Sequence, residues 1–241
     1  MQLSLVIPCY NEGEILPSLL RRLDALTTER PDMEIILVDN GSSDATTELV
    51  RSAPERNSCI VPVRVETNKG YGHGILQGLK TAGGEFLGWT QGDMQTDPMD
   101  VLRALKILEK SDRPARLYLK GKRCARTAGD RFFTCGMSIM ESLLFQQPFW
   151  DINGQPNVFH RSFYENWENP PSDFALELYV YAAALRSGLN IVRFPVLIQN
   201  REYGTSRWNI NIMSRLQLIQ RILKYSFQLR MSLHKNDSSN F

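Results

Sequence analysis

Short apolar runs alternate with helical patterns along the first half of the chain. The runs at 3–8, 34–39, 60–66 and 85–90 are rich in Val, Ile and Leu and are bounded by polar turns, which is typical of buried strands. Between them lie amphipathic stretches such as 13–27, in which leucines recur every three or four residues. This alternation predicts an α/β fold in which a mainly parallel sheet carries helices on both faces.

The second half is less regular but continues without a linker, a repeat or a low-complexity tract. Strands are predicted at 116–123, within 151–163 and at 190–198, and helices over about 130–146 and 173–188. We therefore expect one domain over 1–208, with halves at 1–115 and 116–208, followed by a C-terminal extension over 209–241.

The C-terminal extension is predicted to form an amphipathic helix. Its apolar positions recur at helical spacing and are Ile212, Leu216, Ile219, Leu223 and Phe227. Its opposite side carries Gln217, Arg221, Lys224 and Gln228. Such a basic helix can lie in a membrane interface, pack on the protein's own body, or bind a second copy of the chain.

Composition narrows the class of protein. The chain has 241 residues and 42% hydrophobic content, enough for a sizeable core, and a net charge of +2 that gives no reason to expect a nucleic-acid partner. Four cysteines and three histidines lack the paired spacing of a structural zinc site, so free thiols in a reducing cytosol are expected. No signal peptide is evident, and no apolar run approaches the ~20 residues that span a bilayer. We expect a cytoplasmic protein that at most rests on a membrane surface.

Polar motifs follow several of the predicted strands. "VIPCYNE" (6–12), "VDNGSSD" (38–44) and "GDMQTDP" (92–98) come directly after apolar runs, and "NKGYGHG" (68–74) opens a glycine-rich helix. In open parallel sheets, ligands collect at the carboxyl ends of the strands. Taken singly, local structure explains much of this pattern, because Asp39 forms turns and Asp44 and Asp97 fit helix caps.

Taken together, the four motifs resemble those of the family 2 glycosyltransferases, which have the GT-A fold, and they occur in the same order and spacing. The resemblance extends over nearly the whole chain and is closest to dolichyl-phosphate mannose synthases and related polyprenyl-phosphate hexosyltransferases. It implies a nucleotide-binding half at 1–115, an acceptor half at 116–208, and an inverting enzyme. The implied reaction moves a hexose from a UDP- or GDP-sugar to dolichyl or undecaprenyl phosphate. Transfer to a saccharide hydroxyl and non-catalytic binding of a sugar nucleotide are the alternatives.

The resemblance assigns the turn after the fourth predicted strand to a divalent metal, Mg²⁺ or Mn²⁺, held by Gln91, Asp93 and Gln95. Departure of a nucleoside diphosphate needs a cation or fixed donors, and hard cations prefer oxygen ligands. Related proteins usually carry an aspartate where this chain has Gln91. We therefore expect a metal site that has lost one negative charge and binds its ion more weakly.

The resemblance also implies the other site residues. Those implied to hold the nucleoside are Pro8, Tyr10, Glu12 and Asp39, with Lys69 at the edge of the nucleotide site. Those implied to bind phosphate groups are Arg123, Arg126 and Arg131, together with Arg201 and Ser206 in a segment that would close as a lid. Those implied on the acceptor side are Asn153 and Gln155, which turn formation would also explain.

The residues predicted to be catalytic are Asp93, Arg123, Asp173 and Glu177. Asp173 and Glu177 lie one turn apart on a predicted helix, and either could serve as a general base for a hydroxyl acceptor, although Asp173 also fits a helix cap. A phosphate monoester needs little help from a base, because its second pKa is about 6.

Overall fold

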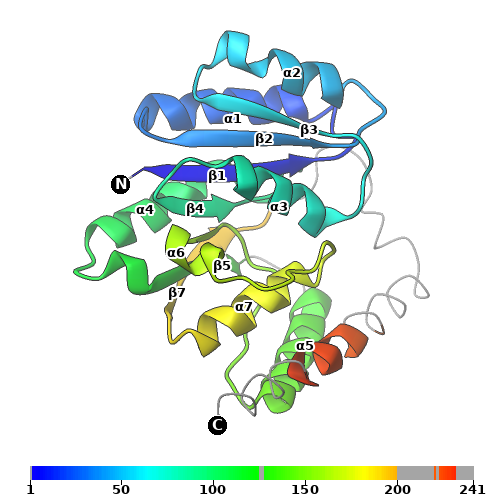
Figure 1. The fold of residues 1–241 in the computed structure, drawn as a ribbon, viewed down its shortest axis with the longest axis vertical. Coiled ribbons are helices and arrows are strands. Elements are labelled where there is room, and N and C mark those ends of the chain that lie inside the picture. The colour runs from blue at the N-terminus through cyan, green and yellow to red at the C-terminus, as the bar shows by residue number, and fades with distance from the viewer. Residues whose placement is uncertain (1, 125–127, 200–219, 221–222, 232–241) are drawn as a thin grey trace.

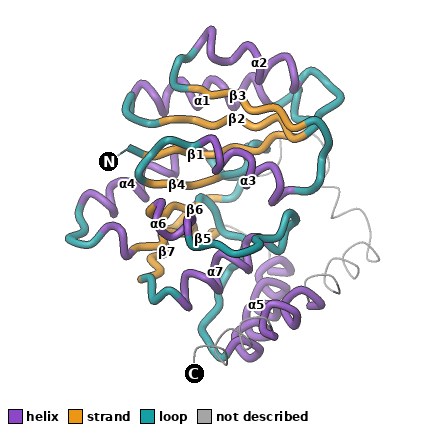
Figure 2. Tube along the Cα trace, viewed as in Figure 1, coloured by secondary structure: helices purple, strands orange, loops and turns teal. Residues whose placement is uncertain are grey.

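A computed structural model describes residues 2–124, 128–199, 220 and 223–231. Its centre is a seven-stranded sheet with the strand order β3-β2-β1-β4-β6-β5-β7 (Figures 1 and 2). The strands are β1 (Leu3–Cys9), β2 (Glu34–Asn40), β3 (Ile60–Val65), β4 (Phe86–Trp89), β5 (Leu117–Cys124), β6 (Asn157–His160) and β7 (Asn190–Leu197). Strands β1 to β4 are parallel to one another, β5 is parallel to β7, and β6 runs antiparallel to both of its neighbours. The predicted fold class, a mixed and mainly parallel sheet, is confirmed.

Helices cover both faces of this sheet. The α-helices are α1 (Leu16–Glu29), α2 (Thr46–Arg56), α3 (Tyr71–Thr81), α4 (Val101–Glu109), α5 (Ala128–Phe145), α6 (Arg161–Glu165) and α7 (Leu176–Arg186). Two 3-10 turns, η1 (Pro98–Asp100) and η2 (Pro114–Arg116), precede α4 and β5. Helix α6 was not predicted, because its five residues are too few to show a helical period.

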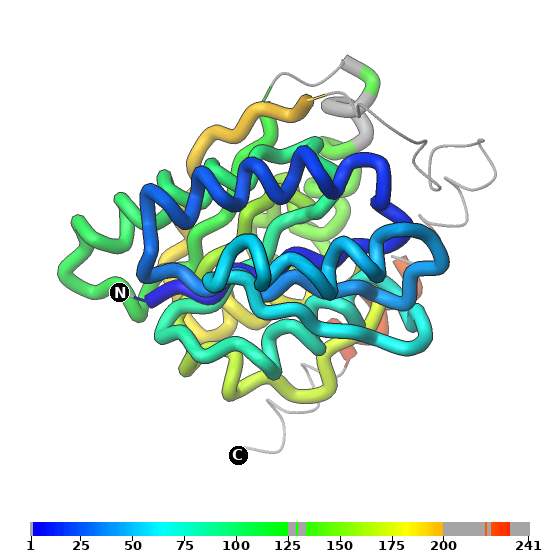
Figure 3. Tube along the Cα trace, turned by 90° about the horizontal axis from the view of Figure 1, so that it is seen from above, coloured from blue at the N-terminus to red at the C-terminus, as the bar shows by residue number. Residues whose placement is uncertain are grey.

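Alternate residues of β1 point into two separate cores, as the two-residue period of a strand requires. Leu5 and Ile7 pack in one core with Leu19 of α1, whereas Val6 packs in the other with Ile75 of α3. Helix α4 shares the first core and α7 the second. Figure 3 shows α1 and α3 on opposite sides of the strands.

Polar side chains and a glycine set the predicted ends of several helices. Asp97 accepts a hydrogen bond from the backbone N–H of Met99 at 2.9 Å, and η1 then leads directly into α4. Asp44 accepts one from the backbone N–H of Thr46, the first residue of α2, at 3.0 Å. Gly188, with φ of +63°, follows the end of α7. These three local predictions are confirmed.

The predicted C-terminal amphipathic helix is described only at its end, over 223–231. Ser226 and Leu229 are buried there, and the Ser226 hydroxyl donates to Oε1 of Glu141 in α5 at 2.7 Å. Phe227, a member of the predicted apolar side, is 58% exposed. The helix thus packs on the protein's own body through a face other than the one predicted. Leu223, also of that predicted side, is half-buried. Ile212, Leu216, Ile219 and the boundary at residue 208 lie outside the described residues. Of the helices in the described segments, none is both long and apolar enough to cross a membrane.

Candidate active site

The ends of β1, β2 and β4 bring the predicted nucleotide and metal residues to one edge of the sheet. Strand β1 pairs in parallel with β2 and with β4, with Cys9 opposite Asp39 and Val6 opposite Trp89. A Cβ atom on Gly92 would lie 2.8 Å from Sγ of Cys9, so the loop after β4 passes directly over the end of β1.

The Cys9 thiol marks the point on which the acidic residues converge. Burial, together with the nearby carboxylates of Glu12, Asp39 and Asp93, raises its pKa well above the usual range. These three acids come from three different strand ends. Their convergence concentrates negative charge at the edge where the sequence predicts a cation.

Asp39 is the most buried of these acids, at 1% exposure. Its Oδ1 accepts a hydrogen bond from the backbone N–H of Ser42 at 2.9 Å, and its Oδ2 pairs with the guanidinium of Arg64 from β3. Burial alone would raise the pKa of Asp39, but hydrogen bonds from Ser42, Thr47 and Arg64 outweigh it and hold the pKa below the usual value. Asp39 is therefore ionised and rigidly held. Arg64 was not singled out from the sequence.

The turn predicted to bind metal carries three oxygen-bearing side chains in five residues. Asp93 is 9% exposed, Gln91 and Gln95 are half-buried, and Oδ1 of Asp93 accepts a hydrogen bond from the backbone N–H of Gln95 at 3.1 Å. Asp97 faces elsewhere, because it pairs with Arg22 of α1. Its role as a cap rather than a ligand agrees with this placement.

The donor set of this turn suits a hard cation. In the described parts of the chain, no group of three or more His, Cys, Asp and Glu side chains could hold a metal ion by itself. Mg²⁺ usually binds through one or two carboxylates together with substrate phosphates. One carboxylate and two amide oxygens therefore fit an ion that shares its coordination sphere with a diphosphate.

The segment that follows β7 begins beside this turn. The backbone N–H of Gln199 donates to the carbonyl oxygen of Gln95 at 2.9 Å. Arg201 and Ser206, the predicted lid residues, lie outside the described residues. Their assignment stays a prediction.

The basic loop after β5 is only partly described. Arg126 lies outside the described residues, as does the side chain of Arg131. Arg123 is half-buried and donates from Nε to Oδ1 of Asp151 at 2.7 Å. Burial opposes ionisation of Asp151, but Arg123 and Arg193 more than compensate and lower its pKa. Asp151, which sequence reasoning missed, therefore orients Arg123, whose phosphate-binding role stays a prediction.

The glycine-rich start of α3 packs against protein backbone. Cβ atoms added to Gly70 and Gly72 would each come within 2.6 Å of a carbonyl oxygen, those of Ser172 and Asp173 respectively. The backbone N–H of His73 also donates to Ser172 at 2.7 Å. The predicted close approach exists, but its partner is the loop before α7. Lys69, just before this contact, is exposed.

A buried ion pair occupies the centre of the acceptor half. Nζ of Lys120, on β5, lies 3.0 Å from Oε2 of Glu177, on α7, and both side chains are at most 2% exposed. Burial lowers the pKa of Lys120 to about 8, although the Glu177 carboxylate opposes this shift. A lysine within the apolar run "LYLKG" was a signal that this strand carries a buried charge in need of a partner.

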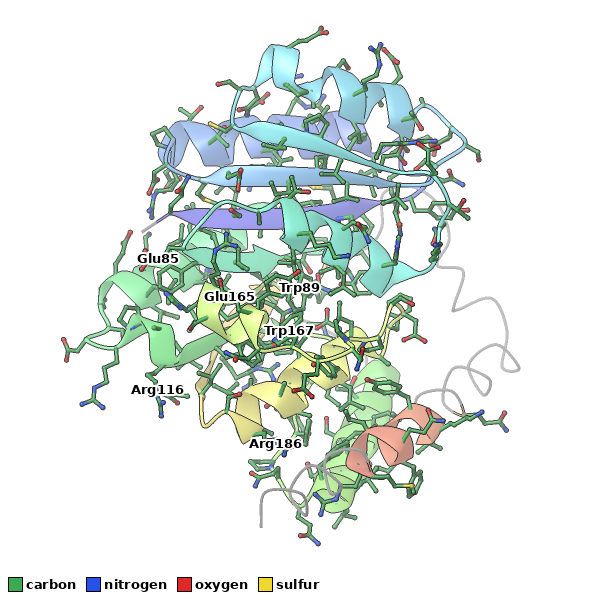
Figure 4. All side chains as sticks on the ribbon, viewed as in Figure 1. Glu85, Trp89, Arg116, Glu165, Trp167 and Arg186 are labelled. Carbon is green, nitrogen blue, oxygen red and sulfur yellow. The ribbon has the colours of Figure 1, made fainter. Side chains whose placement is uncertain are left out.

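Glu177 accepts hydrogen bonds from four further side chains. Oε1 receives them from Trp89 Nε1 at 2.8 Å, from Gln155 Nε2 at 2.9 Å and from the Tyr71 hydroxyl at 3.1 Å. Oε2 receives one from Asn157 Nδ2 at 3.2 Å. The ring of Trp89 packs edge-on against Trp167 (Figure 4). The partners come from α3, β4, β5, β6 and the loop before β6, so they join the two halves of the domain.

The two predicted general bases are thus engaged in different ways. Glu177 is 1% exposed and saturated with donors, whereas Oδ1 of Asp173 accepts from the backbone N–H of Ala175 at 2.9 Å, at the start of α7. This geometry favours a positioning role for Glu177 and a capping role for Asp173. Their catalytic roles stay predictions, as does the role of Asn153 on the acceptor side.

Comparison with known proteins agrees with the fold and with the position of the predicted site. Residues 4–123 match the family model described as glycosyl transferase family 2. The protein belongs to glycosyl transferase family 2. The matched segment holds the motifs predicted to bind the nucleoside, the turn predicted to bind a metal, and most of β5.

Curated proteins similar to this chain are named as undecaprenyl-phosphate sugar transferases. An undecaprenyl-phosphate 4-deoxy-4-formamido-L-arabinose transferase from Serratia proteamaculans is 36% identical over 111 residues, 45% of this chain and 34% of that protein. The protein of the same name from Klebsiella pneumoniae is 28% identical over 219 residues, 88% of this chain and 65% of that protein. The family 2 chain therefore spans less than two thirds of the length of these relatives.

Solved structures share the fold at low sequence identity. A mannosyltransferase from Pyrobaculum calidifontis, in complex with GDP-Man and Mn²⁺, has a TM-score of 0.68 at 20% identity, covering 94% of this chain and 64% of that one. Glucosyl-3-phosphoglycerate synthase from Mycobacterium tuberculosis, with Mn²⁺, UDP-Glc and phosphoglyceric acid, has a TM-score of 0.71 at 17% identity, covering 93% and 79%. The predicted GT-A fold is confirmed.

Proposed function

We propose that this family 2 glycosyltransferase moves a hexose from a UDP- or GDP-sugar to a polyprenyl phosphate such as dolichyl or undecaprenyl phosphate. The main support for a phosphate acceptor is that both candidate general bases, Asp173 and Glu177, are already engaged in structural hydrogen bonds. Glu177 is buried among donors and Asp173 caps α7. A phosphate monoester is already ionised near neutral pH and attacks without a base. The names of the similar curated proteins point to the same acceptor class.

On the donor side, Asp39 and its neighbours would hold the nucleoside through the ionised, rigid carboxylate. Asp93, with Gln91 and Gln95, would hold a divalent ion, Mg²⁺ or Mn²⁺, which supplies positive charge to the departing diphosphate. Arg123, held in place by Asp151, adds a fixed cation near the end of β5. The other residues predicted to contact the nucleotide sugar are Pro8, Tyr10, Glu12, Lys69, Arg126, Arg131, Arg201 and Ser206.

In the proposed reaction, an oxygen of the acceptor phosphate attacks the anomeric carbon of the hexose. The bond from that carbon to the nucleoside diphosphate breaks, and the configuration at the carbon inverts. Water has to be kept away from the same carbon, since hydrolysis of the donor competes with transfer. The polyprenyl chain would place the enzyme at the surface of a membrane, and we expect it on the cytoplasmic side.

The test is an acceptor comparison with purified protein. Undecaprenyl phosphate, undecaprenol and a soluble saccharide are offered with UDP- and GDP-hexoses, each with Mn²⁺, with Mg²⁺ or with a chelator. We expect metal-dependent labelling of the lipid phosphate alone. Labelling of the saccharide, abolished by Asp173→Asn or Glu177→Gln in a folded protein, would instead support the hydroxyl acceptor. Donor binding without transfer to any of the three would support the non-catalytic alternative.

A further inference from the structure

The amide oxygen of Gln155 has no hydrogen-bond partner although it is closed off from solvent. The side chain is 2% exposed, and its Oε1 atom is among the buried polar atoms without a partner. An unpartnered buried acceptor costs free energy, so a folded protein seldom keeps one unless something else supplies the donor. A bound ligand could supply the missing hydrogen-bond donor to Oε1 of Gln155.

The orientation of this amide is fixed by its neighbours. Nε2 of Gln155 donates to Oε1 of Glu177 and to the hydroxyl of Tyr71. The opposite orientation would set the amide oxygen against a carboxylate, which can only accept hydrogen bonds. The Glu177 carboxylate therefore holds the N–H groups on its own side and turns Oε1 away from it.

The backbone of Gln155 and the side chains that contact its amide are also held in fixed positions. A Cβ atom on Gly121 of β5 would lie 2.0 Å from the carbonyl oxygen of Gln155, so the two backbones are in direct contact. Glu177 is anchored in turn by Lys120, and the ring of Tyr71 stacks on Phe174 with centroids 4.7 Å apart. This rigidity is typical of a group that selects a ligand by geometry.

The site adjoins the predicted metal-binding turn. Trp89, the last residue of β4, donates to the same Oε1 atom of Glu177 that receives the Gln155 amide, and the turn with Gln91, Asp93 and Gln95 follows directly along the chain. Any group that reaches Gln155 therefore lies near the place where the diphosphate of the donor would be bound. The hexose is attached to that diphosphate.

We propose that Oε1 of Gln155 accepts a hydrogen bond from a hydroxyl of the donor hexose, and that Tyr71, Glu177 and Lys120 position it for this contact. The inference rests on the proposed function, because an ionised acceptor phosphate has no hydrogen to donate and would be repelled by a carbonyl oxygen. The hydroxyls of the donor belong to its ribose and its hexose, and we assign the hexose; a ribose contact would instead weaken binding of the nucleoside diphosphate alone. A closed site also suits a sugar that must be shielded from water. Gln155, predicted on the acceptor side, becomes a residue that selects the donor sugar.

Donor binding tests this assignment without any acceptor present. Calorimetry compares the affinity of wild type and Gln155→Met for the nucleoside diphosphate alone, for the nucleotide hexose, and for its monodeoxy analogues, all with Mn²⁺. We expect Gln155→Met to weaken binding of the nucleotide hexose about tenfold, the loss of one hydrogen bond, and to leave the diphosphate unchanged. One monodeoxy analogue should bind wild type and variant equally. Equal weakening of diphosphate and nucleotide hexose, or no weakening at all, would overturn the assignment.

A milder substitution covers the case in which Gln155→Met does not fold. Tyr71→Phe keeps the stacked ring and removes only the hydroxyl that holds the amide, so it should lose part of the same discrimination. Tyr179→Phe is the matched control, since its hydroxyl bonds to the backbone of Glu168 outside this cluster. Unchanged discrimination in Tyr71→Phe would overturn the positioning role.

Steady-state transfer then separates this inference from the proposed function. If Gln155→Met raises the KM for the polyprenyl phosphate while donor binding is unaffected, Gln155 belongs to the acceptor site and the inference is wrong. If hexose discrimination behaves as expected but no polyprenyl phosphate is labelled, the proposed acceptor is wrong and the donor contact stands.

Discussion

A single carboxylate, Asp93, stands between two glutamines in the turn after β4, where the resemblance to family 2 glycosyltransferases implies a second acid. All three oxygen-bearing side chains lie within five residues, and Asp93 is nearly buried. The turn differs from a motif with two acids by one negative charge. A hard cation at this position would be neutralised by one protein carboxylate and otherwise by the diphosphate of the donor.

Restoring the missing acid should therefore strengthen metal binding. We expect Gln91→Asp to lower the Mn²⁺ concentration for half-maximal donor binding by about tenfold, since a full negative charge replaces a neutral oxygen. Gln91→Asn is the control, with the size of aspartate but no charge. If Gln91→Asp and Gln91→Asn both behave as wild type, Gln91 does not face the metal.

The Lys120–Glu177 pair allows a second test at this scale. Glu177→Gln leaves a buried ammonium group without its counter-charge, which costs roughly 3–5 kcal/mol in the free energy of unfolding. Adding Lys120→Met should recover much of that loss, as urea unfolding followed by tryptophan fluorescence would show.

The exposed pair Arg51–Glu48 provides the contrast, because Glu48→Gln should leave the urea midpoint of unfolding almost unchanged. A Glu177→Gln protein that unfolds like wild type but no longer transfers sugar would contradict the structural account. That result would return Glu177 to the role of general base.

At the scale of helices and strands, the sequence predicted those features that depend only on residues close together along the chain. The caps at Asp44 and Asp97 and the end of α7 at Gly188 follow from local chemistry and were found where expected. The short helix α6 has too few residues for a recognisable period, whereas the strand predicted within 151–163 is β6. The hydrogen-bond partners of Glu177 could not be predicted from local sequence, because Trp89 and Tyr71 lie 88 and 106 residues away along the chain.

The contact between α5 and the helix at 223–231 should depend on pH. Burial raises the pKa of Glu141 to about 7, although the hydrogen bond from Ser226 opposes the shift, and Oε2 of Glu141 has no partner. The packed state binds the proton more tightly than a detached state whose pKa is near 4.5. Packing therefore weakens as pH rises through this interval, by on the order of 2 kcal/mol between pH 5.5 and 8.

Hydrogen exchange of residues 223–231, corrected for intrinsic rates, measures this change. We expect protection to fall from pH 5.5 to 8 in the wild type and to vary little in Glu141→Gln, which is uncharged throughout. Equal pH dependence in both proteins would show that another group controls the contact.

At the scale of the whole molecule, two halves meet across the centre of one sheet. The alternation of strands and helices predicted the parallel half in full, because each of its units is local. It did not predict that β6 enters between β4 and β5, since strand order depends on contacts between distant segments. The resulting junction brings Tyr71 and Trp89 of one half to Glu177 of the other, next to the turn predicted to bind a metal.

We propose that this junction supports transfer of a hexose to a polyprenyl phosphate with the help of Asp93. The most direct measurement is incorporation of labelled sugar into undecaprenyl phosphate by wild type, Asp93→Asn and Asp97→Asn in the presence of Mn²⁺. We expect Asp93→Asn to lose activity by roughly a hundredfold or more, because it removes charge stabilisation of the departing diphosphate. Asp97→Asn should retain most of the activity, since asparagine also caps a helix. Wild-type activity in Asp93→Asn, or no labelled lipid with any donor, would contradict the account.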